Sequence, residues 1–156
     1  MSSGKRTGSD SYVLLSVGNR RFALPSRIVS ELAPPVRLHT FPQTTPLIVG
    51  AIVRRGRIVP VYDAGPVLIG RESPTHRFYL VASRNFGKVS EPAAIPVNGE
   101  CELANGESLP PDAGHAAYIS GKLAVGEDEV EILDFEALLT SQPGDENPAA
   151  PEEARA

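Results

Sequence analysis

The 156-residue chain has one cysteine, no tryptophan and no long apolar run. Because Cys101 has no second cysteine to pair with, an internal disulfide is excluded, which is typical of a reducing compartment. No segment approaches the ~20 apolar residues of a membrane span, and the polar first ten residues lack the apolar core of a secretory signal. The sequence therefore predicts a cytoplasmic protein with no direct membrane insertion.

The sequence also lacks the motifs of common catalytic and cofactor sites. It contains no glycine-rich nucleotide loop, no G-x-S-x-G nucleophile elbow and no H-E-x-x-H metal motif. His39, His76 and His115 lie far apart, without the spacing of metal ligands, and Cys101 has no sequence cue for an activated thiolate. We therefore expect no catalytic residues, no cofactor and no metal site, and hence no enzyme.

Turn-forming residues, by contrast, are abundant, with 15 prolines and 14 glycines. They divide residues 11–140 into short apolar segments, which favours a mainly β fold. Residues 1–10 and the acidic, proline-rich residues 141–156 are predicted to be disordered. Strands are expected at residues 12–17, 22–24, 47–53, 58–62, 78–82, 93–97, 117–123 and 130–133, with a helical turn and strand at 28–32 and a short helix at 135–139.

A repeat emerges when the sequence is shifted by 71 residues. The matching pairs are Ile48 and Ile119, Gly50 and Gly121, Ile52 and Leu123, Val59 and Val130, Val61 and Ile132, Asp63 and Asp134, and Leu68 and Leu139. Matches at one fixed offset indicate duplication of a supersecondary unit. We expect two five-stranded barrels or curled sheets, which share an apolar interface because a unit of ~65 residues buries too little surface alone.

Asp63 and Asp134 occupy the same position in the two copies, after a strand and before a turn or helix. That position is typical of a helix N-cap, whose carboxylate accepts hydrogen bonds from free backbone N–H groups. A catalytic pair of carboxylates would instead have to converge on one pocket. We interpret both aspartates as structural residues, together with the matching Gly50 and Gly121.

The segment Arg54-Arg55-Gly56-Arg57 forms the charged tip of a predicted hairpin. Gly56 permits the positive φ of a tight turn, and arginine side chains suit carboxylate-rich protein surfaces. A merely soluble hairpin tip is the other interpretation. Aromatic residues are not interleaved with these arginines, so we expect no nucleic-acid partner.

The net charge of -4 conceals an uneven distribution of positive and negative residues along the chain. Residues 11–84 carry ten Lys/Arg and three Asp/Glu, whereas residues 85–140 carry two Lys/Arg and eleven Asp/Glu. We take each half to hold one copy of the repeat. The split predicts two different partner surfaces or head-to-tail association, or else two simply solvated faces.

Residues 50–63 resemble the hallmark G-x-[IV]-N-L-R-G-x-[IV]-[LV]-P-[VI]-x-D-L of CheW-like domains, with Val53 and Arg54 in the places of Asn and Leu. The resemblance covers about residues 11–140. Segments similar to the family's opening hairpin, its V-x-E-V stretch and its C-terminal half are 12–17, 21–25, 28–32, 108–111, 118–121 and 132–135.

The resemblance implies two five-stranded SH3-like barrels around a shared hydrophobic core. It also implies a non-catalytic adaptor that joins a CheA-type histidine kinase to the cytoplasmic tips of methyl-accepting chemoreceptors. By position, Glu31, Arg55 and Gly56 match the family's partner-contact residues, and Arg54 and Arg57 complete the charged tip. A CheW-like adaptor that binds only one of these partners, and a small-barrel nucleic-acid binder, remain alternatives.

Overall fold

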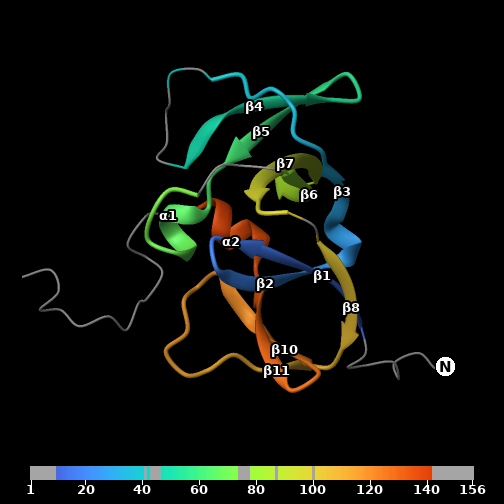
Figure 1. Ribbon diagram of the computed structural model, residues 1–156, viewed down its shortest axis with the longest axis vertical. Helices are drawn as coiled ribbons and strands as arrows, with labels where there is room; N and C mark the ends of the chain where they lie inside the picture. The colour runs from blue at the N-terminus through green and yellow to red at the C-terminus, as the bar shows by residue number, and fades with distance from the viewer. Residues whose placement is uncertain are drawn as a thin grey trace, which may run out of the picture.

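The computed structural model describes residues 10–40, 42, 47–73, 78–86, 88–99 and 101–141. Two curved, mainly antiparallel sheets lie one above the other along the long axis of the molecule, with helices α1 (Gly65–Leu68) and α2 (Phe135–Leu139) between them (Figure 1). The fold is mainly β, with two SH3-like barrels and a short C-terminal helix, which confirms the predicted class. The predicted disordered ends lie almost wholly outside the described residues.

The first barrel is a six-stranded sheet with the order β8-β1-β2-β11-β10-β9, one strand more than the five predicted, because the two-residue strand β9 pairs with the edge of β10. It joins the N-terminal hairpin to the C-terminal third of the chain through a parallel pairing of β2 with β11. Its strands are β1 (Asp10–Val17), β2 (Arg20–Pro25), β8 (Glu102–Gly106), β9 (Ser108–Leu109), β10 (Ile119–Val125) and β11 (Asp128–Leu133).

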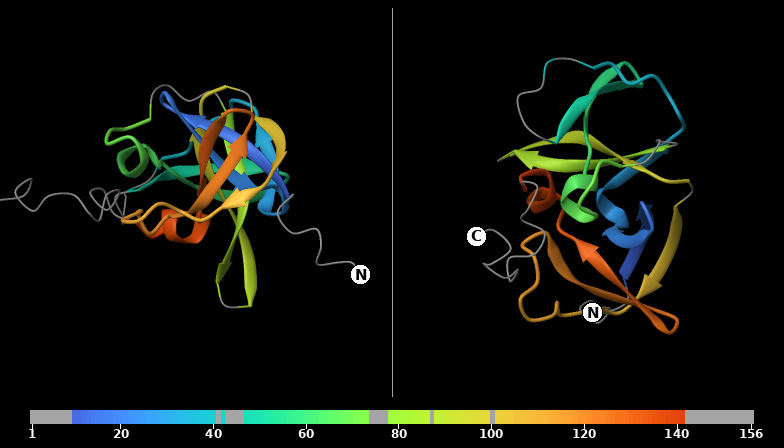
Figure 2. Two further views of the ribbon diagram at one scale, coloured as in Figure 1. Left: turned by 90° about the horizontal axis from the view of Figure 1, so that it is seen from below. Right: turned by 60° about the vertical axis from the view of Figure 1, so that its left-hand side comes forward.

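The second barrel is a five-stranded sheet with the order β3-β6-β7-β5-β4, in which β5 runs parallel to β7. The long hairpin of β6 and β7 projects from the body of the molecule (Figure 2). The strands of the second barrel are β3 (Val29–Ala33), β4 (Ile48–Arg54), β5 (Arg57–Tyr62), β6 (Phe78–Phe86) and β7 (Val89–Val97). Strand β3 follows the 3-10 turn η2 (Ser26–Ile28).

The predicted duplication is confirmed down to the hydrogen-bonding register. In the β4–β5 hairpin Gly50 pairs with Val61, and a bulge separates Gly50 from Ile48. In the β10–β11 hairpin Gly121 pairs with Ile132, and a bulge again precedes the glycine. Every one of these positions is displaced by 71 residues. Each copy therefore contributes the same bulged hairpin, followed by a short helix, to its own barrel.

The core has a part inside each barrel and a part between the barrels. Ile52 and Val59 belong to the cluster inside the second barrel, and their counterparts Leu123 and Val130 belong to the cluster inside the first. The largest cluster combines buried residues of both sheets and both helices. Alternate residues of a strand face opposite sides of the sheet, so a strand can contribute to the interior of its own barrel and to this shared cluster. The shared cluster is the predicted apolar interface.

Each half of the sequence holds one copy of the repeated hairpin, but the halves do not coincide with the two barrels. The first barrel takes strands from both ends of the sequence, so neither half holds one barrel. Residues 26–99, which contain the second barrel, carry nine Lys/Arg and four Asp/Glu, whereas residues 10–25 and 100–140 together carry three and eleven. The second barrel is thus basic and the first acidic, with the boundaries set by topology. Strands β8 and β9 were not predicted, and the turn or helix expected after Asp63 is helix α1.

Candidate partner-binding surface

The β4–β5 hairpin ends in a two-residue turn at Arg55 and Gly56, between the closing pair Arg54 and Arg57. Both turn residues have positive φ, 54° for Arg55 and 79° for Gly56. Two consecutive positive φ values are typical of the type I′ turns that match the twist of β-hairpins. An arginine in the left-handed region costs ~1–2 kcal/mol, which the pairing of the flanking strands must offset. We call residues 53–58 the arginine hairpin.

Arg54 forms a two-point ion pair with Glu31 of β3. Its Nη2 atom donates to Glu31 Oε1 at 2.8 Å and its Nε donates to Oε2 at 3.1 Å. Strands β3 and β4 are the two edges of the five-stranded sheet, so this pair bridges the edges and helps to close the barrel. Hydrogen bonding from Arg54 lowers the pKa of Glu31, and the charges of Arg54 and Arg55 lower it further against the opposing effect of burial.

The other two arginines of the hairpin remain accessible. Arg55 Nε lies 3.8 Å from Glu31 Oε2, yet the Arg55 side chain is 79% exposed. Arg57 is exposed and forms no ion pair within the described part of the chain. The hairpin therefore presents two planar donor groups to solvent, where each can donate a pair of hydrogen bonds to a carboxylate of another molecule.

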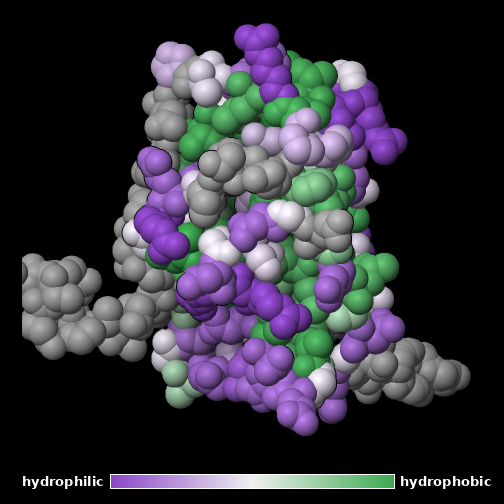
Figure 3. Space-filling view, viewed as in Figure 1, coloured by the Kyte–Doolittle hydropathy of each residue, from purple (hydrophilic) through white to green (hydrophobic). Residues whose placement is uncertain are grey.

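Apolar side chains lie beside these arginines. Val53 and Ile58 are cross-strand partners and are 52% and 75% exposed. The space-filling view shows hydrophobic residues gathered over β4 and β5 next to strongly hydrophilic ones (Figure 3). A neighbouring pocket of about 290 Å³ is lined by Ser30, Glu31, Arg54, Arg55, Arg57, Val59, Val81 and Pro92.

The sequence interpretation missed the apolar part of this surface. Strict alternation along β4 and β5 could have shown it, because Val53 and Ile58 face opposite to the buried Ile52 and Val59. The structure brings together the five predicted contact residues, Glu31, Arg54, Arg55, Gly56 and Arg57, around one hairpin tip. Of these, Glu31 and Arg54 are largely engaged with each other.

The four predicted structural residues lie in the framework of the two hairpins. Asp134 is the N-cap of α2, and its Oδ1 accepts a hydrogen bond from the Ala137 N–H at 3.1 Å. The prediction for Asp63 needs correction, because Ala64 is the N-cap of α1. Asp63 is buried and instead accepts hydrogen bonds from the Gly65 N–H and from both the N–H and the hydroxyl of Ser73.

Gly50 and Gly121 are sites of close backbone approach. A Cβ atom on Gly50 would lie 2.5 Å from the carbonyl oxygen of His39, and one on Gly121 would lie 2.7 Å from that of Leu109. Real Cβ atoms do not come so near, so both positions exclude any side chain without a backbone shift. In each hairpin the backbone of another segment, at His39 or at Leu109, therefore passes so close that only glycine fits.

The remaining chemistry-bearing side chains form no cluster. Within the ranges described above, no group of three or more His, Cys, Asp and Glu side chains is placed to hold a metal ion. Burial raises the pKa of the Cys101 thiol to about 11, which keeps it protonated at neutral pH. Over the same residues, none of the helices is long and apolar enough to cross a membrane.

These features define a class of protein: two small barrels with a shared core and an exposed hairpin that carries charged and apolar side chains. The family model for the CheW-like domain matches residues 11–143. The chain belongs to the CheW-like domain family, as the resemblance of its motifs indicated. A search of curated protein sequences gave no significant match.

The fold is similar to that of the scaffolding protein TtCheW from Thermoanaerobacter tengcongensis. The TM-score is 0.71 at 18% sequence identity, over 88% of this chain and 97% of that chain. At this identity the likeness shows the fold. Family and fold together support a chemotaxis adaptor or scaffold, a kind of protein that is generally not an enzyme.

Proposed function

We propose that this chain is a cytoplasmic, non-catalytic adaptor that couples the tips of chemoreceptors to a CheA-type histidine kinase. The arginine hairpin is its contact surface. The observation that carries the proposal is the exposure of Arg55, Arg57, Val53 and Ile58 on one hairpin. Apolar contact area supplies affinity at such a surface, while the charges set orientation and exclude wrong partners.

The basic character of the second barrel supports an acidic partner surface. An arginine pairs bidentately with a carboxylate and brings geometric as well as charge complementarity. Arg55 is the best placed for this role, because it lies at the most distant point of the turn and the hydrogen-bonded turn fixes its backbone.

The first prediction concerns Arg55. Arg55→Glu should weaken binding of the kinase, of receptor tips or of both by about tenfold or more, because a like charge then faces the partner's carboxylates. Pull-down followed by titration with each partner separately would measure this. Arg21→Glu is a matched control, since Arg21 is an exposed strand residue of the first barrel.

Titrating each partner separately also distinguishes an adaptor that couples both partners from one that binds only a single partner. Loss of one interaction alone would indicate that the hairpin serves a single partner. If Arg55→Glu bound both partners as tightly as the wild-type chain, the proposed contact surface would be wrong. Circular dichroism of the variant would verify that the fold is retained.

A further inference from the structure

Residues 142–156, which follow helix α2, are strongly acidic. They contain four Asp/Glu and one Arg, a net charge of -3, and the acids form two pairs at residues 145–146 and 152–153. The CheW-like family match ends at residue 143, so almost all of this segment lies outside it. We call residues 142–156 the acidic tail.

The arginine hairpin is complementary to the acidic tail in composition. Arg55 is 79% exposed and Arg57 is exposed, and each guanidinium can donate a pair of hydrogen bonds to a carboxylate. Val53 and Ile58 beside them are 52% and 75% exposed. The tail likewise places small apolar residues, the Pro-Ala-Ala-Pro of 148–151, between its two pairs of acids.

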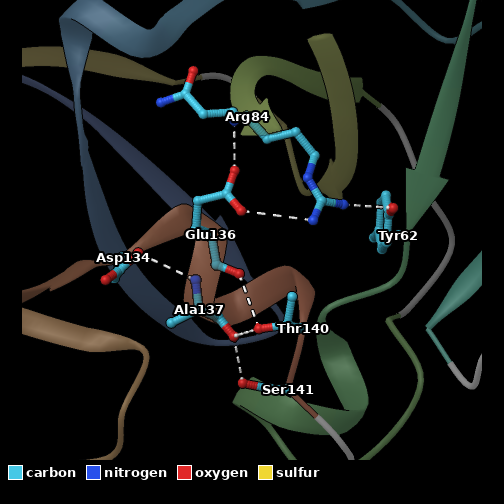
Figure 4. A network of polar contacts seen from close by, with 8 residues as sticks. Tyr62, Arg84, Asp134, Glu136, Ala137, Thr140 and Ser141 are labelled. Atoms are coloured by element: carbon cyan, nitrogen blue, oxygen red, sulfur yellow. Dashed lines mark hydrogen bonds and ion pairs between the residues drawn. The ribbon is translucent and has the colours of Figure 1, made fainter. Parts of the chain in front are cut away.

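The start of the acidic tail is linked to the base of the hairpin by a chain of contacts. Ser141 is hydrogen-bonded to the last turn of α2. From the same helix, Glu136 lies 3.6 Å from Arg84, which donates to the hydroxyl of Tyr62 at 2.7 Å (Figure 4). Tyr62 ends strand β5, whose other end is Arg57 at the hairpin turn, about 17 Å away.

The acidic tail is long enough to cover this route. Along β5, through the linked side chains and down the last turn of α2 the route measures about 40 Å, and the straight line is shorter. Residue 153 follows Ser141 by 12 residues, about 40 Å of extended chain, and the side chains at both ends add to this reach. Tethering also raises the local concentration of the tail to about the millimolar range, so weak contacts suffice for partial occupancy.

We infer that the acidic tail docks on the arginine hairpin and competes with the partner for the Arg55 and Arg57 guanidinium groups. The inference rests on the proposed function, because it names what regulates the same contact surface. A tail that is bound about two thirds of the time leaves a third of the hairpins free and weakens the apparent affinity about threefold. Binding then favours a partner whose further contacts displace the tail over one that offers carboxylates alone.

An acidic tail that acts only through its net charge makes a different prediction. In that case, neutralising any four exposed carboxylates of the chain would ease the approach of an acidic partner to the same extent. The hairpin arginines would not respond to the tail when no partner is present. Docking requires that the tail carboxylates alone have the effect and that Arg55 and Arg57 sense their loss.

The test neutralises the four acids of the tail in the full chain. The tail variant combines Asp145→Asn, Glu146→Gln, Glu152→Gln and Glu153→Gln. The control variant makes the same change of charge at four exposed acids of the first barrel. It combines Glu102→Gln, Glu107→Gln, Glu127→Gln and Asp128→Asn.

Two measurements compare these variants with the wild-type chain. Without any partner, the NMR resonances of the Arg55 and Arg57 Nε–H groups should shift in the tail variant and stay in place in the control variant. In titrations at about 0.05 M salt, the tail variant should bind the CheA-type kinase about threefold more tightly, and the control variant should bind like the wild-type chain. The gain should vanish near 1 M salt, where the Debye length is about 3 Å.

Each outcome decides the question. Unchanged Arg55 and Arg57 resonances in the tail variant, or equal gains in kinase affinity for both variants, would overturn the inference and leave the proposed function standing. Shifts that depend on protein concentration would assign the tail to a second copy and would overturn docking within one chain. Failure of the wild-type chain and the tail variant to bind kinase or receptor tips would refute the proposed function, while the partner-free resonances would still decide whether the tail docks.

Discussion

Asp63 and Asp134 occupy equivalent positions in the two copies of the repeat but have different roles. Asp134 is exposed and accepts one bond, from the N–H of Ala137. Asp63 is 6% exposed and accepts three bonds, two of which come from Ser73. Asp63 thereby ties the loop after α1 back to the end of β5, in addition to ordering the start of the helix.

Substitution of the two aspartates should therefore have unequal effects. Asp134→Ala should cost ~0.5–2 kcal/mol, as the loss of a helix cap does. Asp63→Ala should cost about 3 kcal/mol, because it leaves buried N–H and hydroxyl donors without their acceptor. Urea denaturation of both variants would measure the difference. Equal costs would contradict the distinction between a cap and a buried clamp.

At this scale the sequence predicts that both aspartates have a structural role, but it does not predict which groups Asp63 binds. Both follow a strand, so a structural function is indicated. The contact of Asp63 with Ser73 joins residues ten apart, on either side of helix α1, and Ser73 lies outside any helix or strand. No periodicity reports such a contact, and the N-cap prediction was correspondingly right for Asp134 and wrong for Asp63.

At the scale of the element, the arginine hairpin was predictable as a hairpin but not as a surface. The flanking apolar runs and the glycine indicate the turn and its register. The Arg54–Glu31 pair was not foreseen, since it joins two edge strands that become neighbours only when the sheet curves into a barrel. Curvature of this kind depends on packing against the rest of the molecule.

The apolar side of the hairpin yields a prediction of its own. Ile58→Ser should weaken partner binding about threefold to tenfold, because it removes an apolar side chain adjacent to Arg57 from the contact area. Stability should change by less than about 0.5 kcal/mol, since Ile58 is 75% exposed. Isothermal titration and thermal denaturation would measure the two effects.

Leu103→Ser provides the matched control for this variant. Leu103 is 76% exposed and lies on β8 of the first barrel, away from the hairpin. Both substitutions remove a comparable exposed apolar side chain. Equal losses of affinity in the two variants would argue that binding depends on general surface hydrophobicity and that the hairpin has no special part.

The two barrels are held together as a whole by more than the shared apolar core. Glu136 of α2 reaches across to β6 of the second barrel, where Oε2 accepts the Asn85 N–H at 2.6 Å and Oε1 lies 3.6 Å from Arg84 Nη2 (Figure 4). Arg84 is buried, and its Nη1 donates to the hydroxyl of Tyr62 at 2.7 Å. We call Tyr62, Arg84, Asn85 and Glu136 the inter-barrel latch.

The latch also shows what a sequence cannot provide at the scale of the molecule. The repeat predicts two units and their need for a common interface, and both are confirmed. The order of strands is not contained in the repeat, because the N-terminal hairpin crosses over to join the C-terminal copy. Contacts across the interface, such as that of Glu136 with β6, depend on this crossover.

Glu136→Ala should loosen the interface between the barrels. The Glu136 side chain is 42% exposed, so the loss of this charged acceptor of the Asn85 N–H should cost about 1–2 kcal/mol; the cost exceeds that of an exposed ion pair because the guanidinium of Arg84 is buried. Glu131→Ala is the matched control. Glu131 pairs with Arg20 within the first barrel, and both side chains are more than a third exposed, so its loss should cost only ~0–1 kcal/mol.

Hydrogen exchange adds a readout that a general loss of stability would not produce. In Glu136→Ala the amide of Asn85 should exchange faster by a larger factor than amides in the centre of β10, which lies far from the latch. Glu136→Gln keeps an acceptor for that N–H and should lie between the wild-type chain and the alanine variant. Uniform acceleration throughout both barrels, or equal costs for Glu136→Ala and Glu131→Ala, would show that the apolar core alone holds the barrels together.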